Sequence, residues 1–185
     1  MSHPLATLAS TDVRLQVRVG VYAVFALVAA LFLLALHLVP AGVSHRLLPI
    51  LLMGDPSLLA FFFVGGMVVV DRDGGVLEAL LTTPVTLSAY MAAKVGTLSA
   101  LGALLGVVVA ALAASGPVAW WLLVPALFLT GLVAGLLAFV AIAFWQDVNR
   151  YFLFGGIAII PLFAPLVPFL SSVSWPWVQA LPTGA

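Results

Sequence analysis

The sequence has 185 residues, of which 65% are hydrophobic and 6% are charged, and its mean hydropathy is +1.32. Average soluble domains contain about 45–50% apolar and about 25% charged residues, so this chain could not cover a folded core with polar surface and stay in solution. The composition therefore excludes a soluble enzyme, a basic nucleic-acid-binding module and a disordered chain. It predicts an all-α, polytopic protein in a lipid bilayer. The absence of cysteine also excludes disulfides and Cys-ligated metals.

Five stretches are apolar enough to be membrane-spanning helices, which need about 20 such residues each. The second is interrupted by Gly54-Asp55-Pro56, where Asp55 resembles an N-cap and Pro56 a first helical residue. Because the charge-free run after Pro56 is short, we expect this helix either to continue past Asp71 or to begin earlier with a kink. We interpret residues 1–185 as one transmembrane domain, with spans at about 19–39, 50–70, 95–114, 121–145 and 151–168.

The basic residues predict the orientation of these spans, because cytoplasmic loops carry an excess of Lys and Arg. With a cytoplasmic N-terminus, five basic residues fall on the cytoplasmic side and only Arg46 falls on the other. The five are Arg14, Arg18, Arg72, Lys94 and Arg150. We therefore expect residues 1–18 to be cytoplasmic or interfacial, residues 71–94 to be a cytoplasmic segment, and residues 171–185 to be an external tail.

The segment from Asp71 to Pro84 holds four of the 12 charged residues. Gly74-Gly75 breaks the preceding helix, and Thr83-Pro84 stops the next one, since a residue before proline is pushed out of the helical region. Between these breaks, apolar residues repeat at helical spacing and Glu78 points away from them. The apolar stripe consists of Val76, Leu77, Leu80 and Leu81.

Two interpretations fit this short amphipathic helix. It is either an elbow that buries its leucines in the lipid headgroup region, or a docking helix for a cytoplasmic partner. After it, Thr86 or Ser88 can cap a helix that runs through Tyr90 and Lys94 into the third span.

The run from Gly75 to Val85, Gly-Val-Leu-Glu-Ala-Leu-Leu-Thr-Thr-Pro-Val, resembles the signature of ABC-2 type transporter permeases, and so do Tyr90 and Lys94 after it. Shorter pieces agree with this resemblance in order along the chain. They are Asp12-Val13-Arg14-Leu15-Gln16, Asp55-Pro56-Ser57-Leu58-Leu59 with Phe61 to Gly66, Asp147-Val148-Asn149-Arg150, and Leu181-Pro182-Thr183. Together they are most similar to the bacterial branch known as fluoroquinolone-export permeases.

The resemblance implies the membrane-spanning permease subunit of an ABC-type exporter in the bacterial inner membrane. Such a subunit pairs with a second permease subunit, as a homodimer or a heterodimer, and moves a small hydrophobic or amphipathic compound, such as a drug, by alternating access. Carried over by matching position, the coupling helix that contacts a separate ABC ATP-binding subunit comprises Gly75, Leu77, Glu78, Leu80, Leu81, Thr83 and Pro84. The family has a sixth span after the Leu-Pro-Thr element, where this sequence stops.

We expect ATP and Mg²⁺ to bind to the partner subunit and no cofactor to bind to this chain, because the sequence lacks the G-x-x-x-x-G-K-[ST] loop that cradles phosphates. The chain itself is then not an enzyme. The alternatives are a non-transporting membrane assembly or scaffold protein, a truncated permease paralogue, and a small channel, which the lack of polar rings within the spans disfavours.

Other residues are interpreted as structural. Gly102 with Gly106, and Gly131 with Gly135, have the spacing that lets helices approach closely, either within one chain or in a dimer. The three histidines are too scattered for a metal site. Lys94 is placed at the edge of a span, and no charge has to lie at the middle of the membrane. Asp147 and Arg150, three residues apart, are expected to form an ion pair.

Overall fold

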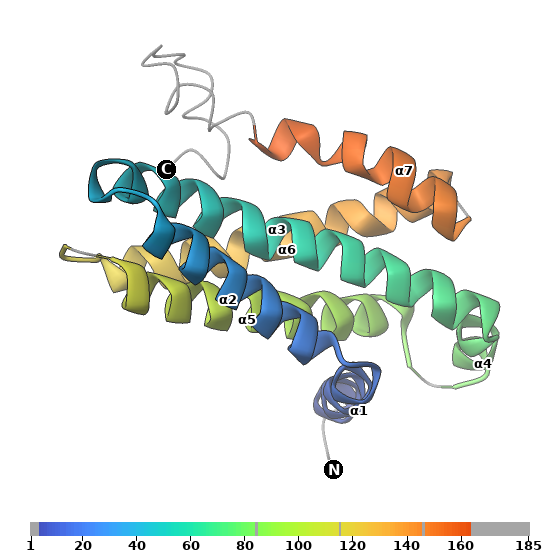
Figure 1. Ribbon diagram of the computed structural model, residues 1–185. Coiled ribbons are helices and arrows are strands. Elements are labelled where there is room, and N and C mark those ends of the chain that lie inside the picture. Colours follow the sequence, from blue (N-terminus) through green and yellow to red (C-terminus); the bar gives the residue numbers. More distant parts are fainter. Residues whose placement is uncertain (1–3, 84, 115, 146, 164–185) are drawn as a thin grey trace.

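The computed structural model describes residues 4–83, 85–114, 116–145 and 147–163, and within these residues every regular element is a helix (Figure 1). This confirms the all-α prediction. In chain order the elements are α1 (Pro4–Val19), α2 (Val21–Leu38), α3 (Ala41–Asp73), α4 (Val76–Leu81), α5 (Leu87–Ala113), α6 (Trp120–Phe144), α7 (Val148–Ala158) and the short 3-10 helix η1 (Ile160–Phe163).

Four helices in the described part of the chain are long and apolar enough to cross a membrane. They lie at Val21–Leu38, Leu47–Asp73, Leu87–Ala113 and Trp120–Phe144. The protein is therefore a polytopic membrane protein. The expected fifth span at 151–168 overlaps α7, which has 11 residues, and η1. Residues 164–168 of that expected span and the expected tail at 171–185 lie outside the described residues.

The second expected span is one continuous helix, α3, which begins at Ala41. The interpretation of Asp55 as an N-cap is therefore wrong, and the alternative that the helix begins earlier is confirmed. α3 has 33 residues and is about 50 Å long at 1.5 Å per residue, whereas the hydrocarbon core of a bilayer is about 30 Å thick. Apolar runs lie before Gly54 and after Ser57, and α3 packs along α5 and α6. This packing outweighs the one backbone hydrogen bond that a proline removes.

The spans form a bundle with α3 at its centre, packed on α5 and α6 and flanked by α2 and α7. In Figure 1, α1 is seen along its axis while these helices lie lengthwise, so α1 runs across the bundle and rests on α5. Gly20, with φ of 83°, makes the turn between α1 and α2; this left-handed conformation costs glycine little.

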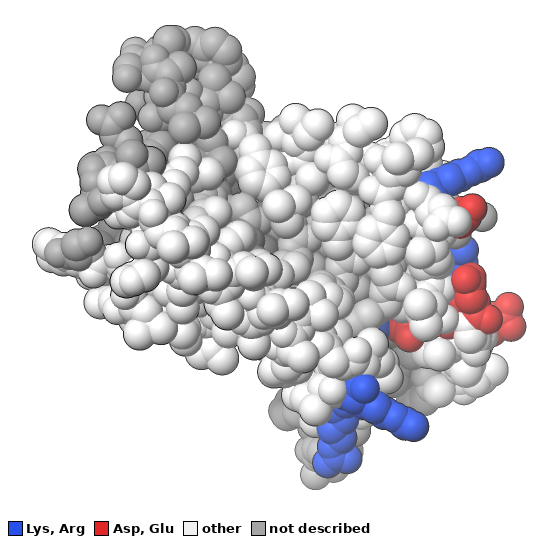
Figure 2. Space-filling view, viewed as in Figure 1, with Lys and Arg blue, Asp and Glu red and all other residues white. Residues whose placement is uncertain are grey.

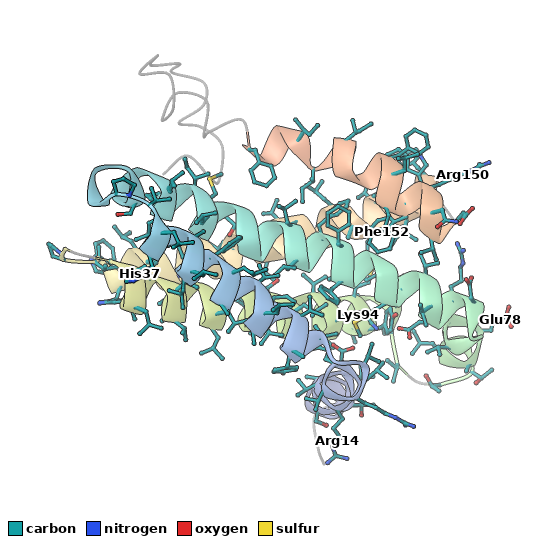
Figure 3. All side chains as sticks on the ribbon, in the orientation of Figure 1. Arg14, His37, Glu78, Lys94, Arg150 and Phe152 are labelled. Atoms are coloured by element: carbon teal, nitrogen blue, oxygen red, sulfur yellow. The ribbon has the colours of Figure 1, made fainter. Side chains whose placement is uncertain are left out.

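The charged side chains gather at one end of the bundle, where Figure 2 shows blue and red atoms next to an otherwise white surface. We call this the charged end, and define it as the end that holds α4, the start of α7 and α1. Glu78 and Arg150 lie there in Figure 3, and His37 lies at the opposite end. The apolar body exposes many large hydrophobic side chains, including Leu31, Leu129 and Leu136, as a surface facing lipid does.

Candidate functional site

The α3–α4–α5 segment makes a tight elbow at the charged end (Figure 1). α3 ends at Asp73, and Gly75, with φ of 73°, reverses the chain before the six-residue helix α4. A side chain at this position would be strained, so a glycine is required for α4 to follow α3 directly. The elbow comprises the described part of residues 71–94, the segment expected to be cytoplasmic.

The two faces of α4 differ as its sequence pattern predicts, with one exception. Leu77 and Leu80 pack against the hydrophobic core, and Glu78 is exposed. Val76, expected in the apolar stripe, is instead 44% exposed and borders an open cavity beside Leu80. α4 therefore presents both an acidic and an apolar side chain at the charged end.

The hydroxyls of Thr82 and Thr83 close α4 by donating to the carbonyls of Ala79 at 2.7 Å and Leu80 at 2.8 Å. These bonds satisfy acceptors that a helix C-terminus otherwise leaves open. The side chain of Leu81 and the whole of Pro84, both assigned to the coupling helix by resemblance, lie outside the described residues. Thr86 then caps α5 by accepting a hydrogen bond from the Ala89 N–H at 3.3 Å, which confirms one of the two predicted caps.

A buried ionic network joins the two ends of the elbow. The Lys94 Nζ, in α5, lies 2.6 Å from Oδ2 of Asp71 in the last turn of α3. The Tyr90 hydroxyl donates to the same carboxylate oxygen at 2.5 Å. The side chain of Lys94 is only 3% exposed and that of Asp71 only 12%, so this pair is shielded from water and stronger than a surface ion pair.

The network extends to α1. Asp12 places Oδ1 3.5 Å from the same Lys94 Nζ. Its other oxygen accepts hydrogen bonds from Thr97 Oγ1 and Gln16 Nε2, both at 2.6 Å. Gln16, fully buried, also donates to Thr97 at 2.8 Å. We call these six residues the shared-lysine network: Asp12, Gln16, Asp71, Tyr90, Lys94 and Thr97.

As predicted, one helix runs from the Thr86 cap through Tyr90 and Lys94 into the third candidate span; it begins at Leu87. One signal for this network was available: Lys94 is the only lysine of the chain and follows Tyr90 by four residues, which puts both on one helical face. The pattern does not reveal that Asp12 and Asp71 meet it.

Two cavities adjoin Asp71. One, of about 220 Å³, lies between α1, the elbow and α5, and is bordered by Asp12, Lys94, Tyr90, Leu8 and Leu80. The other, of about 360 Å³, is an aromatic groove between α1, α3 and α7, lined by Phe62, Phe63, Met67, Val70 and Phe152. An apolar groove with a few polar groups is the usual form of a small-molecule site.

The remaining predicted residues lie away from the elbow. Gly106 of α5 lies against Leu127 of α6, while Gly131 and Gly135 of α6 lie against Ser99 and Val95 of α5. Gly102 is buried in α5. Gly106, Gly131 and Gly135 therefore line the contact of α5 with α6 within one chain.

The expected Asp147–Arg150 ion pair is not formed between these two described residues. Asp147 instead caps α7 by accepting a hydrogen bond from the Asn149 N–H at 3.0 Å, which a carboxylate ahead of a helix does readily. Within the described ranges 4–83, 85–114, 116–145 and 147–163, no three His, Cys, Asp or Glu side chains converge as metal ligands would.

A bundle of several apolar spans with a short helix at its charged end defines a polytopic α-helical membrane protein. The chain belongs to the fluoroquinolones export permease protein family, whose model matches residues 3–185. Two curated relatives, the fluoroquinolones export permease proteins of Mycobacterium tuberculosis strains CDC 1551 and H37Rv, are each 39% identical to it over 75 residues. This match covers 40% of the chain and 32% of each relative, so the chain matches about a third of their length. No solved structure matches the chain.

Proposed function

We propose that this chain is the membrane-spanning permease subunit of an ABC-type exporter, with its N-terminus and charged end in the bacterial cytoplasm. The family match over residues 3–185 supports export. The observation that carries the ATP-driven mechanism is α4, a short helix anchored on the core by Leu77 and Leu80 that exposes Val76 and Glu78. Such a helix can transmit a push to the spans, because the elbow ties it to both α3 and α5.

The energy would come from ATP and Mg²⁺ held by a separate ABC ATP-binding subunit that contacts α4. Two permease subunits and two ATP-binding subunits would make the exporter. The excess of basic residues on one side supports the cytoplasmic orientation of α4.

The substrate would be a small hydrophobic or amphipathic compound, and a fluoroquinolone, named by the family, is the first to test. The aromatic groove supports this class, since Phe62 and Phe152 stack with ring centroids 5.5 Å apart beside Asp71. Aromatic rings offer apolar area, and a carboxylate offers a polar contact, to such a molecule.

Co-purification tests the contact with the ATP-binding subunit. The full chain is co-expressed with each ABC ATP-binding subunit from its own genome and captured in detergent. Glu78→Arg and Val76→Asp change exposed side chains of α4 and should reduce the captured ATPase by at least about tenfold, the factor that about 1.4 kcal/mol of lost binding gives. Arg150→Glu, an exposed charge reversal on α7 at the same end, is the matched control.

The proposal is overturned if the wild-type chain captures no ATP-binding subunit. Equal retention of the ATPase by Glu78→Arg, Val76→Asp and Arg150→Glu would show that α4 is not the contact. A cysteine introduced at Glu78 should react with a membrane-impermeant thiol reagent only from the cytoplasmic side. Labelling from outside would contradict the proposed orientation.

A further inference from the structure

The shared-lysine network contains two carboxylates and one ammonium group. Lys94 contacts Asp71 at 2.6 Å and Asp12 at 3.5 Å. Each carboxylate has its own hydrogen-bond donors, Tyr90 for Asp71 and the pair Gln16 and Thr97 for Asp12. Both positions for the ammonium are therefore prepared, but one ammonium cannot make a short contact to both carboxylates in the observed arrangement.

The two carboxylates lie on elements that have different roles. Asp71 lies in the last turn of α3, three residues before Gly74 and Gly75, which lead into α4. Asp12 lies in α1, which crosses the bundle outside the spans and packs on α5. A shift of Lys94 from one carboxylate to the other would therefore loosen the elbow and tighten α1 in a single movement.

Space and a spare acceptor exist for this shift. The cavity of about 220 Å³ is bordered by Asp12, Asp71 and Lys94 together, so open space adjoins all three residues. On the α1 side, the fully buried Oε1 of Gln16 has no hydrogen-bond partner among the described residues. A buried acceptor without a donor is costly, so the observed arrangement leaves the α1 side of the network incompletely satisfied.

We propose that Lys94 is a positioning residue that exchanges between Asp71 and Asp12, and so couples the position of the α4 elbow to that of α1. Buried charges are best attested as devices for specificity and switching and not for stability, and two discrete arrangements are what carries coupling through a structure. The exchange is a property of this chain. Its use in transport rests on the proposed function: force on α4 would pull Asp71 from Lys94 and pass the movement to α1.

Spin labels can measure this coupling directly, since the chain has no native cysteine to remove. Cysteines replace Arg14 and Ala79, which are exposed on α1 and α4. The distance between the labels is measured by pulsed electron paramagnetic resonance on the full chain in lipid nanodiscs. Asp71→Asn leaves Asp12 as the charged partner of Lys94 and should shift the mean distance by on the order of 2 Å, the size of typical helix shifts.

The other variants separate exchange from a fixed scaffold. Asp12→Asn should keep the wild-type mean and narrow the distribution, because only the Asp71 position remains. Asp73→Asn, which removes an exposed carboxylate two residues away, is the matched control and should change nothing. If Asp71→Asn does not fold, Asp71→Glu is used instead. It lengthens the side chain by one methylene and should also shift the mean distance between the labels.

The inference is overturned if the distance distributions of the Asp71 and Asp12 variants coincide with that of wild type. It is also overturned if both variants change the distribution in the same way, as expected of a rigid scaffold. This measurement needs no ATPase, so its failure is distinct from failure of the proposed function, which shows as lost ATPase capture. With the ATP-binding subunit bound, Asp12→Asn should retain the complex and its thermal stability but lose transport, whereas a merely structural role would leave transport intact.

Discussion

The charged end and the middle of the bundle are held together by different forces. In the middle, helices meet through glycines: Gly131 and Gly135 of α6 lie against α5, and Gly106 of α5 lies against Leu127 of α6. At the charged end, helices meet through the shared-lysine network. Close packing depends steeply on distance and favours one arrangement, whereas charges can exchange partners. The comparison indicates that the middle fixes the fold and that the charged end is where movement can begin.

The largest effect is expected from Lys94→Met, which removes the one cation that Asp12 and Asp71 share. Removing one member of a buried ion pair leaves an uncompensated charge and costs about 3–5 kcal/mol. The temperature at which the detergent-solubilised protein loses its monodisperse peak in size-exclusion chromatography should fall sharply. Arg150→Met, an exposed cation at the same end, should leave it unchanged; equal losses in both would mean that the network is not buried as described.

The next effect tests close packing through glycine, at two adjacent glycines of α3 that face the start of α7. A methyl group on Gly65 would overlap the ring and hydroxyl of Tyr151, while one on Gly66 would lie 3.7 Å from Phe152, at ordinary contact distance. Gly65→Ala would also displace the Tyr151 hydroxyl from the Phe61 carbonyl, to which it donates at 2.6 Å. We expect Gly65→Ala to lower the free energy of unfolding by about 3 kcal/mol through overpacking. The size-exclusion assay should show this as a lower temperature at which the monodisperse peak is lost. Gly66→Ala should be within about 0.5 kcal/mol of wild type, and a reversed order would contradict the α3–α7 contact.

A smaller effect is expected where α6 meets α5. A Cβ added at Gly131 would lie 3.1 Å from the Cα of Ser99, so the backbone of α5 itself would have to move. Gly131→Ala should lower the free energy of unfolding by about 1–2 kcal/mol. On the facing helix, Gly96 has nothing within 4 Å of an added Cβ, and Gly96→Ala should be neutral or slightly stabilising, since alanine favours a helix. If Gly131→Ala instead left stability unchanged while abolishing dimerisation, this glycine would serve a contact between subunits.

The sequence predicted the individual helices better than the contacts between them. Apolar runs indicated the helices that became α2, α5 and α6, and the breaks at Gly74-Gly75 and Thr83-Pro84 framed α4. These signals are local, and local patterns specify local structure. The Asp55-Pro56 pair misled because tertiary packing of α3 overrides a cap signal. The network was missed because Asp12 and Thr97 are 85 residues apart in the sequence, and no periodicity encodes which distant polar residues meet.

The smallest effect distinguishes two buried hydroxyls at the α5–α6 contact. Thr130 Oγ1 donates to the Leu127 carbonyl at 3.0 Å, whereas Ser99 Oγ, in a fully buried residue, has no partner among the described residues. A buried hydroxyl without a partner has lost its bonds to water and gained nothing, so Ser99→Ala should be neutral or stabilising by up to about 1 kcal/mol. Thr130→Val, nearly the same shape, should lose about 0.5–1 kcal/mol with its hydrogen bond. If Ser99→Ala lowers the thermal midpoint more than Thr130→Val does, the Ser99 hydroxyl has a partner in the membrane, and the α5–α6 contact would then be polar as well as close-packed.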